Sequence, residues 1–265
     1  MDGGQHLPQE ASPQAVMPER RIAGIAVADI AGADAIRRLD AALASDAGPT
    51  RLAFLNAHCV NLVRAKPDYR KALAACLVLP DGIGVDIAAR LLYGARFREN
   101  LNGTDFVPRL LSALDRPLRV ALIGGAPGVA ERAAGRFGEI APHHDYVTIS
   151  DGYFDAAGQA VILTALEHAD ADIVLVAMGV PAQELFLVNA LNPRHGRLFV
   201  GVGALFDFYA GNVSRAPALV RRLRMEWVWR LGLEPARLWR RYILGNPAFL
   251  LGILRDRFAP RHPIG

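Results

Sequence analysis

Short apolar segments alternate along most of the chain with stretches in which apolar residues recur at helical spacing. The apolar segments predict strands at residues 22–27, 51–55, 76–79, 119–123, 146–149, 173–177 and 198–202. The helically spaced stretches predict helices at residues 33–44, 57–63, 68–75, 84–92, 129–137, 156–168 and 181–191. Gly24 interrupts the first strand, and the alternation ends near Asn212.

This alternation predicts an α/β fold with a Rossmann-like, mainly parallel sheet that is flanked by helices. Functional groups gather at the carboxyl ends of the strands in such a sheet. Residues 1–20 are polar and contain no apolar run of the kind found in signal peptides, so we expect a disordered tail there. We expect the α/β core at residues 21–211 and a basic, aromatic helical appendage at residues 212–265.

Composition narrows the classes of protein that fit this pattern. A hydrophobic content of 52% supplies ample material for a buried core. The formal net charge is +4, and its concentration after residue 212 indicates an anionic surface that meets this end of the chain. No recognised nucleic-acid-binding motif is present. The two cysteines, Cys59 and Cys76, lie in apolar segments and are expected to be reduced thiols in a cytoplasmic protein.

The last part of the chain mixes arginine with tryptophan. The arginines are residues 215, 221, 222, 224, 230, 237, 240 and 241, and Trp227, Trp229, Trp239 and Tyr242 stand among them. This mixture suits lipid head groups, and it suits equally an amphipathic helix that packs on its own domain with solvated arginines. No run reaches the roughly 18 apolar residues that span a bilayer. The longest late run, residues 242–254, is interrupted by Asn246 and Pro247.

The order of residues in this region is more specific than its composition. Gly203, Phe206, Asp207, Phe208 and Gly211 are followed in series by Arg215-Ala216-Pro217, Glu226-Trp227, Arg230-Leu231, Glu234-Pro235, Arg237 and Arg241-Tyr242. The series resembles the C-terminal signature of the WecG/TagA/CpsF family of bacterial glycosyltransferases. The resemblance implies inverting transfer of a sugar from a UDP-sugar to a polyprenyl-diphosphate-linked saccharide in the synthesis of surface polysaccharide, exopolysaccharide or teichoic acid. It also implies an enzyme that needs neither a cofactor nor a metal ion.

Asp81 follows the predicted strand at residues 76–79. A carboxylate at this place can take a proton from an attacking hydroxyl as a general base, although Asp-Gly is also ordinary turn chemistry. The resemblance implies that Asp81 is the catalytic base, because family members carry a similar Asp-Gly after a strand.

Asn56 follows the strand at residues 51–55 and matches an asparagine that lines the family's nucleotide-sugar site. Phe54 replaces a family threonine, so that hydroxyl contact is absent. His58 can contact a phosphate or a sugar, or can hydrogen-bond locally, and the sequence leaves its role open.

Residues 99–105 resemble a family segment that commonly reads Glu-Arg-x-x-Gly-x-Asp. The resemblance implies substrate binding by Asn102 and Gly103. Asn100 stands where many members have an arginine suited to a diphosphate, so the group that neutralises the leaving diphosphate is open. Asp105 can also be a helix N-cap or a first-turn charge.

Three further segments supply candidate ligands of the donor. Gly124 and Gly125 open a glycine-rich turn before a helix, where backbone amides can hold phosphate, but the strict dinucleotide spacing is missing and a tight turn explains them equally well. Gln183 is expected to hydrogen-bond sugar hydroxyls, while Glu184 remains undecided. By resemblance, Arg215 reaches the donor diphosphate.

The predicted partners follow from these residues: a UDP-sugar donor, a lipid-linked saccharide acceptor and the anionic inner face of the cell membrane, with no nucleic acid. N-acetylmannosamine, its uronic acid and glucose all fit as the donor sugar, and a homo-oligomer is left open. Asp170 and Asp172 precede a strand instead of following one, so they are not expected to bind a metal ion. A nucleotide-dependent oxidoreductase and a non-catalytic membrane-associated scaffold are the rival functions.

Overall fold

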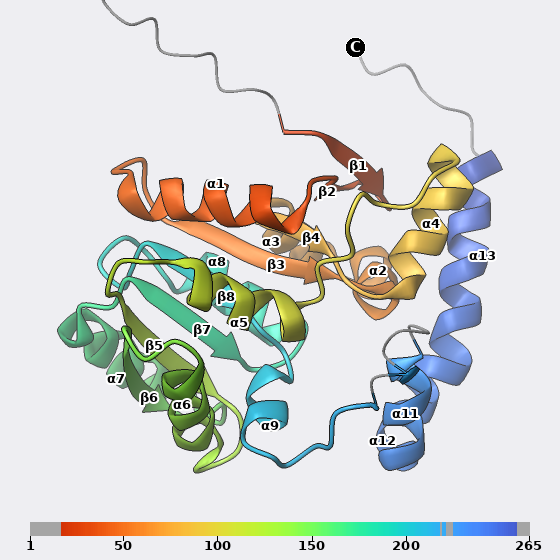
Figure 1. The fold of residues 1–265 in the computed structure, drawn as a ribbon. Coiled ribbons are helices and arrows are strands. Elements are labelled where there is room, and N and C mark those ends of the chain that lie inside the picture. Colours follow the sequence, from red (N-terminus) through yellow and green to blue (C-terminus); the bar gives the residue numbers. More distant parts are fainter. Residues whose placement is uncertain (1–16, 218, 221–224, 259–265) are drawn as a thin grey trace, which may run out of the picture.

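The computed structural model of the chain describes residues 17–217, 219–220 and 225–258 (Figure 1). Its main sheet has six parallel strands in the order β4-β3-β8-β7-β5-β6. The strands are β3 (Thr50–Leu55), β4 (Leu77–Pro80), β5 (Arg119–Gly124), β6 (Asp145–Ser150), β7 (Ile173–Ala177) and β8 (Leu198–Gly201). The predicted α/β fold with a mainly parallel sheet is therefore confirmed.

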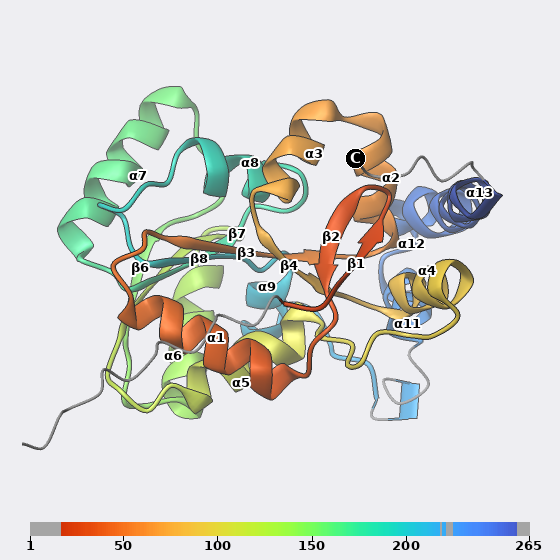
Figure 2. The same cartoon turned by 90° about the horizontal axis from the view of Figure 1, so that it is seen from above.

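Residues on the two faces of each strand enter different clusters of the core. On β3, Leu52 and Phe54 enter one cluster while Ala53 and Leu55 enter another, as the alternation of side chains in a strand requires. One face is covered by α1 (Gly32–Ala44), α5 (Gly103–Ala113) and α6 (Val129–Ile140). The other is covered by α2 (Ala57–Ala65), α3 (Pro67–Ala74), α7 (Ala156–Ala169) and α8 (Ala182–Asn189), as Figure 2 shows. The apolar runs of the strands follow from burial on both faces.

The start of the chain differs from the prediction of one interrupted strand. Glu19–Ile22 and Ile25–Ala28 form an antiparallel hairpin, β1 and β2, separate from the main sheet. Ala23 and Gly24 join them with φ angles of 50° and 83°, as a two-residue hairpin turn with positive φ at both positions requires. The expected disordered tail must also be corrected at its end, since β1 begins at Glu19. Residues 1–16 lie outside the described residues.

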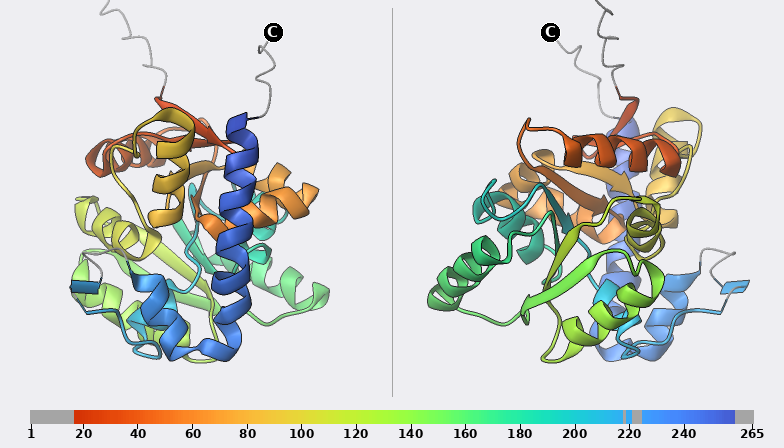
Figure 3. Two further views of the ribbon diagram at one scale, coloured as in Figure 1. Left: turned by 90° about the vertical axis from the view of Figure 1, so that its right-hand side faces the viewer. Right: turned by 60° about the vertical axis from the view of Figure 1, so that its left-hand side comes forward.

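The C-terminal segment contains α9 (Leu205–Tyr209), α11 (Glu226–Leu233), α12 (Pro235–Trp239), a π-helical turn η1 (Arg240–Leu244) and α13 (Gly245–Phe258). The helix continues through Asn246 and Pro247, because a proline in the first turn of α13 loses no necessary hydrogen bond. α13 packs along α2 and α4 (Ile83–Tyr93), as Figure 3 shows. Among the described residues, no helix combines the length and the apolar character needed to cross a bilayer.

α13 belongs to the core although it lies in the expected appendage. Phe249 and Ile253 are fully buried in the cluster that contains α2 and α4. Arg64 of α2 makes two hydrogen bonds to the Asp256 carboxylate, with N–O distances of 3.2 and 2.5 Å. The expected boundary near residue 212 therefore marks a change in sequence composition. It does not divide the protein into two separately packed parts, because α13 shares a core cluster with α2 and α4.

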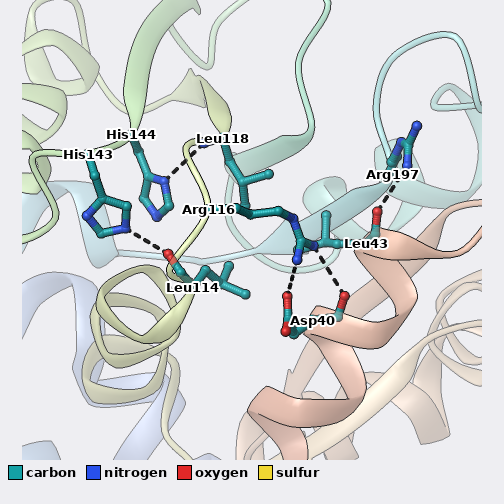
Figure 4. A network of polar contacts seen from close by, with 8 residues as sticks. All are labelled: Asp40, Leu43, Leu114, Arg116, Leu118, His143, His144 and Arg197. Atoms are coloured by element: carbon teal, nitrogen blue, oxygen red, sulfur yellow. Dashed lines mark hydrogen bonds and ion pairs between the residues drawn. The ribbon is translucent and has the colours of Figure 1, made fainter.

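The amino edge of the sheet is closed by a polar network (Figure 4). Arg116 binds the Asp40 carboxylate at the end of α1, and the buried His144 accepts a hydrogen bond from the Leu118 amide. The second ring nitrogen of His144 donates to the Leu111 carbonyl, which requires a neutral ring. These residues serve packing, and they lie at the opposite edge from the strand ends that carry the candidate chemistry.

Candidate active site

Asn56 and Asp81 meet at the carboxyl edge of the sheet. They directly follow the neighbouring parallel strands β3 and β4, and the Asp81 amide donates to the Leu55 carbonyl at 2.9 Å. This extends the β3–β4 pairing by one step and brings the two side chains together. Asn56 Nδ2 donates to Asp81 Oδ2 at 3.2 Å.

Asn56 is fixed from its other end as well. It is the N-cap of α2, and its Oδ1 accepts a hydrogen bond from the Cys59 amide at 3.1 Å. Because the oxygen is used by the helix, the amide nitrogen must face Asp81. The pair is therefore oriented by secondary structure and needs no ligand to form.

The surroundings of Asp81 make its carboxylate a stronger base than an exposed aspartate. Removal of the carboxylate from water raises its pKa above the ordinary value of 3.8. The hydrogen bond from Asn56 and the positive charge of Arg241 oppose that rise. A carboxylate with a raised pKa, held beside a polar amide, suits proton abstraction.

Asn102 and Gly103 lie at the start of α5, a helix that the helical periodicity did not predict because Gly103 and Pro108 weaken the pattern. Asn102 is its N-cap and accepts from the Asp105 amide at 3.0 Å. A Cβ at Gly103 would stand 3.1 Å from the Phe54 ring. The Phe54 ring, at the position where the resemblance implies a threonine, thus packs directly against Gly103.

Arg215 joins this cluster from the segment after α9. Its guanidinium forms an ion pair with Asp105, which also accepts from Asn102 Nδ2 at 2.9 Å. Arg215 also lines a cavity of about 640 Å³ between α6 and the residues after α9, together with Arg132 and Tyr209. The predicted contact of Arg215 with the donor diphosphate, in a site shared by the core and the appendage, stays a prediction.

Two further arginines of the appendage act on Asp81. Arg241 and Arg230 lie close enough to lower its pKa by their charge. The sequence placed both in the ordered C-terminal series but did not indicate that they face Asp81. The Nε atoms of both are buried and have no hydrogen-bond partner within the described part of the chain.

His58 borders a pocket of about 410 Å³ that is also lined by Arg237, Arg240 and Arg241. Burial, and to a smaller extent the positive charge of Arg241, together lower the pKa of His58 to about 4. His58 is therefore neutral near neutral pH, and it can act there as a hydrogen-bonding group but not as a cation.

Gly124 and Gly125 also lie at the carboxyl edge, after β5. A Cβ at Gly124 would stand 2.4 Å from the Ala177 carbonyl oxygen, and the Gly125 amide donates to that same oxygen at 3.0 Å. Close packing against the end of β7 therefore accounts for Gly124, while a φ of 80° and the Val129 side chain, 2.9 Å from an added Cβ, account for Gly125. The Gly125 amide is used within the protein, so a phosphate at this turn would need other amides.

Gln183 is buried and makes two internal hydrogen bonds. Its Oε1 accepts from the Gly203 amide at 3.0 Å, and its Nε2 donates to Glu184 Oε1 at 2.8 Å. Gln183 thus holds the turn after β8 in place. Its expected contact with sugar hydroxyls stays a prediction.

Asp170 and Asp172 lie on the far side of the molecule from Asp81. Asp170 ends α7, and Asp172 precedes β7 and accepts from the Arg119 amide at 2.9 Å. Among the described residues, no group of three or more histidine, cysteine, aspartate or glutamate side chains could hold a metal ion.

Known proteins match the chain over most of its length. Residues 20–263 match the model of the glycosyl transferase WecG/TagA/CpsF family. A Bacillus subtilis (strain 168) protein named N-acetylglucosaminyldiphosphoundecaprenol N-acetyl-beta-D-mannosaminyltransferase is 32% identical over 191 residues, which cover 71% of this chain and 73% of that protein. A protein of the same name from Bacillus spizizenii (strain ATCC 23059 / NRRL B-14472 / W23) is 33% identical over 199 residues, covering 74% and 76%.

Proposed function

This chain belongs to the WecG/TagA/CpsF family of glycosyl transferases, and on that premise we propose that it transfers a sugar from a UDP-sugar to a polyprenyl-diphosphate-linked saccharide. The observation that carries the proposal is the oriented Asn56–Asp81 pair beneath the arginines of the C-terminal segment. The names of the two Bacillus relatives support an acceptor of this class.

In the proposed reaction Asp81 removes the proton from the acceptor hydroxyl. The hydroxyl oxygen bonds to the anomeric carbon of the donor as the bond from that carbon to the UDP oxygen breaks on the opposite face, so the configuration inverts. Developing positive charge on the sugar ring is expected, as in other glycosyl chemistry. Asn56 holds the Asp81 carboxylate in place by its hydrogen bond.

The departing diphosphate needs positive charge, and arginine supplies it best through several N–H groups. Arg215, Arg230 and Arg241 each have a buried Nε with no hydrogen-bond partner among the described residues. A buried N–H group without an acceptor destabilises the folded protein unless a ligand accepts its hydrogen bond. We assign Arg215, beside Asn102 and Gly103, to the donor diphosphate, and this offsets the missing family arginine at position 100.

The outer face of α13 supports contact with an anionic membrane. Leu251 and Phe258 are 69% and 78% exposed and stand seven positions apart, on the face opposite to Phe249 and Ile253. Arg255 lies on the same helix, and arginines next to exposed apolar side chains suit the interface of an anionic leaflet. The enzyme is then a peripheral protein of the inner membrane face, where a lipid-linked acceptor resides.

The deciding experiment measures UDP release and product formation by the purified full chain with a panel of UDP-sugars and a short-chain polyprenyl-diphosphate N-acetylglucosamine. The panel contains UDP-linked N-acetylmannosamine, its uronic acid and glucose. We expect Asp81→Asn to lower the transfer rate about 10²–10⁴-fold, the usual contribution of a general base, without unfolding the protein.

Asp34→Asn is the matched control, because Asp34 is in the first turn of α1 and pairs with Arg37. It should leave the rate unchanged. Normal transfer by folded Asp81→Asn would remove Asp81 from the role of base. Absence of transfer by the wild-type chain with every donor, together with retained liposome binding, would favour the non-catalytic scaffold.

A further inference from the structure

The turn that carries Asp81 is tied to the rest of the protein on both sides. On one side the Asp81 amide donates to the Leu55 carbonyl of β3 at 2.9 Å. On the other side the Leu101 amide donates to the Pro80 carbonyl at 2.9 Å, so the segment before α5 runs along the turn. The residue next to Leu101 in this segment is Asn100.

Asn100 makes two hydrogen bonds to a single residue, Gly82. Its Oδ1 accepts from the Gly82 amide at 2.8 Å, and its Nδ2 donates to the Gly82 carbonyl at 2.9 Å. A side-chain amide carries a donor and an acceptor in the same plane, so it can pair with a backbone N–H and C=O as a neighbouring strand does. Asparagine satisfies both groups at once.

Gly82 needs a partner from outside its own helix. It is the N-cap of α4, it has a φ of 83°, and no side chain caps that helix. The amide of an N-cap residue has no partner within the helix, so Asn100 satisfies a group that α4 leaves open. The bonds fix the residue after Asp81 and the first turn of α4 together.

We propose that Asn100 is a positioning residue that holds the Asp81 carboxylate in register with Asn56, an inference that rests on the proposed transferase function. An arginine at this position would only donate hydrogen bonds, so it could not accept from the Gly82 amide. In this chain Asn100 therefore fixes the position of Asp81. The positive charge that meets the diphosphate comes from the C-terminal arginines.

The test compares Asn100→Ala and Asn100→Asp in the full chain, with Asn192→Ala as control. Asn192 also accepts from a backbone amide, that of Arg194, in a turn before β8 at the amino edge. We expect Asn100→Ala to lower kcat about 10²-fold, the size of effect that misplacement by about 1 Å produces, with a donor KM within about twofold of wild type. Hydrogen exchange at the Gly82 amide should become faster.

Asn100→Asp keeps the size of the side chain but loses one of its two hydrogen bonds to Gly82. Its carboxylate still accepts from the Gly82 amide, so exchange there should stay slow, but it cannot donate to the Gly82 carbonyl. Its negative charge should raise the pKa of Asp81, which moves the rising limb of the kcat–pH profile to higher pH. If Asn100→Ala fails to fold, this variant carries the test through kcat on the plateau of that profile, which should fall because one of the two hydrogen bonds to Gly82 is lost; a wild-type plateau would overturn the proposal.

Wild-type kcat in folded Asn100→Ala would overturn the proposal. A raised donor KM with unchanged kcat would also overturn it, because Asn100 would then be a substrate contact. If the wild-type chain transfers no sugar while Asn100→Ala speeds exchange at Gly82, the tether is supported and the transferase function is what fails.

Discussion

Asp105 and Arg215 form an ion pair although 110 positions separate them in the chain. The pair links the first turn of α5 to the start of the C-terminal segment, beside the cavity of about 640 Å³. Neither residue alone predicts this meeting, since Asp105 resembles any first-turn carboxylate and Arg215 any basic residue of the tail. The resemblance to the family singled out Arg215, and the structure shows its protein partner.

We predict that Arg215→Ala lowers kcat/KM for the UDP-sugar about 10–10²-fold, since hydrogen bonds to charged groups contribute about 1.5–3 kcal/mol. Binding to anionic liposomes should be retained. Steady-state kinetics and liposome co-sedimentation measure the two effects separately. Arg136→Ala, which removes a cavity arginine that pairs with Glu139, is the control. Full activity of Arg215→Ala would show that Arg215 of the C-terminal segment does not contribute to the active site.

Glu184 is a residue whose role the sequence left undecided. It is completely buried at the start of α8, and burial raises its pKa from 4.5 to about 7 although Gln183 donates a hydrogen bond to it. The folded protein therefore holds a proton on Glu184 more strongly than the unfolded chain does. This contribution to stability is fully present below about pH 4.5 and is lost as the pH rises through about 7.

We predict that Glu184→Gln, which keeps the shape and cannot ionise, is more stable than wild type at pH 8 and nearly equal to it at pH 5. A pKa rise of this size corresponds to about 3 kcal/mol. Urea unfolding at several pH values measures the difference. Glu131→Gln, in the first turn of α6, should show no such pH-dependent difference. Equal stability of Glu184→Gln and wild type at pH 8 would contradict the prediction.

At the scale of elements, hydrophobic periodicity predicted the strands and helices that have long apolar patterns. It missed the elements that depend on a few residues. The strands at the centre of the sheet and the helices on its faces follow from continuous apolar runs and helical spacing. The β1–β2 hairpin depends on two turn residues, Ala23 and Gly24, and α5 contains a glycine and a proline that helices usually avoid. In α5 tertiary packing outweighs local propensity, whereas the hairpin follows from a turn signal too short for periodicity to detect.

α13 shows the same limit for the C-terminal segment. The arginines and tryptophans at residues 215–242 left two interpretations open, contact with lipid head groups and packing of an amphipathic helix on its own domain, and did not indicate that Phe249 and Ile253 of α13 are core residues. Truncation after Asn212 would remove both and open the cluster that holds α2 and α4. Loss of membrane binding after such a truncation would therefore not separate docking from unfolding, and surface substitutions are the sharper test.

We predict that Leu251→Glu combined with Phe258→Glu strongly reduces co-sedimentation with anionic liposomes and leaves the thermal unfolding transition unchanged. Removal of apolar contact and addition of negative charge both weaken binding to the leaflet. Val161→Glu on α7 is the matched control, because Val161 and Leu251 are both 69% exposed. Undiminished binding by the double variant would show that α13 is not the membrane-contacting face.

At the scale of the whole molecule, the sheet gathers the candidate residues because all six strands are parallel. Their carboxyl ends share one edge, which is why Asn56, Asp81 and Gly124 could be expected in one region from the sequence. The strand order could not be predicted, because nothing local to β3 indicates β8 as its second neighbour. The approach of Arg230 and Arg241 to Asp81 was hidden for the same reason, since it depends on how α13 returns along the core.

The arrangement at this edge also bears on metal dependence. The acidic pair Asp170 and Asp172 lies toward the amino edge, where Asp172 is already used by the Arg119 amide. We predict that transfer continues in excess EDTA, since arginines rather than a cation are placed to meet the diphosphate. The assay compares initial rates with EDTA, Mg²⁺ and Mn²⁺. A strict requirement for either ion would contradict the prediction.

The docking of α13 has a consequence for the exchange of parts between relatives. Asn61 donates to the Gly245 carbonyl at 2.8 Å, Arg64 binds Asp256, and Arg257 donates to the Leu91 carbonyl, so α13 is matched to α2 and α4 residue by residue. α2 begins after Asn56, and α4 begins after Asp81 and Gly82. A chimera that replaced residues 212–265 with those of a relative would therefore mismatch the helices that follow Asn56 and Asp81. A functional exchange of this segment would therefore require that Asn61, Arg64 and the end of α4 are exchanged with it.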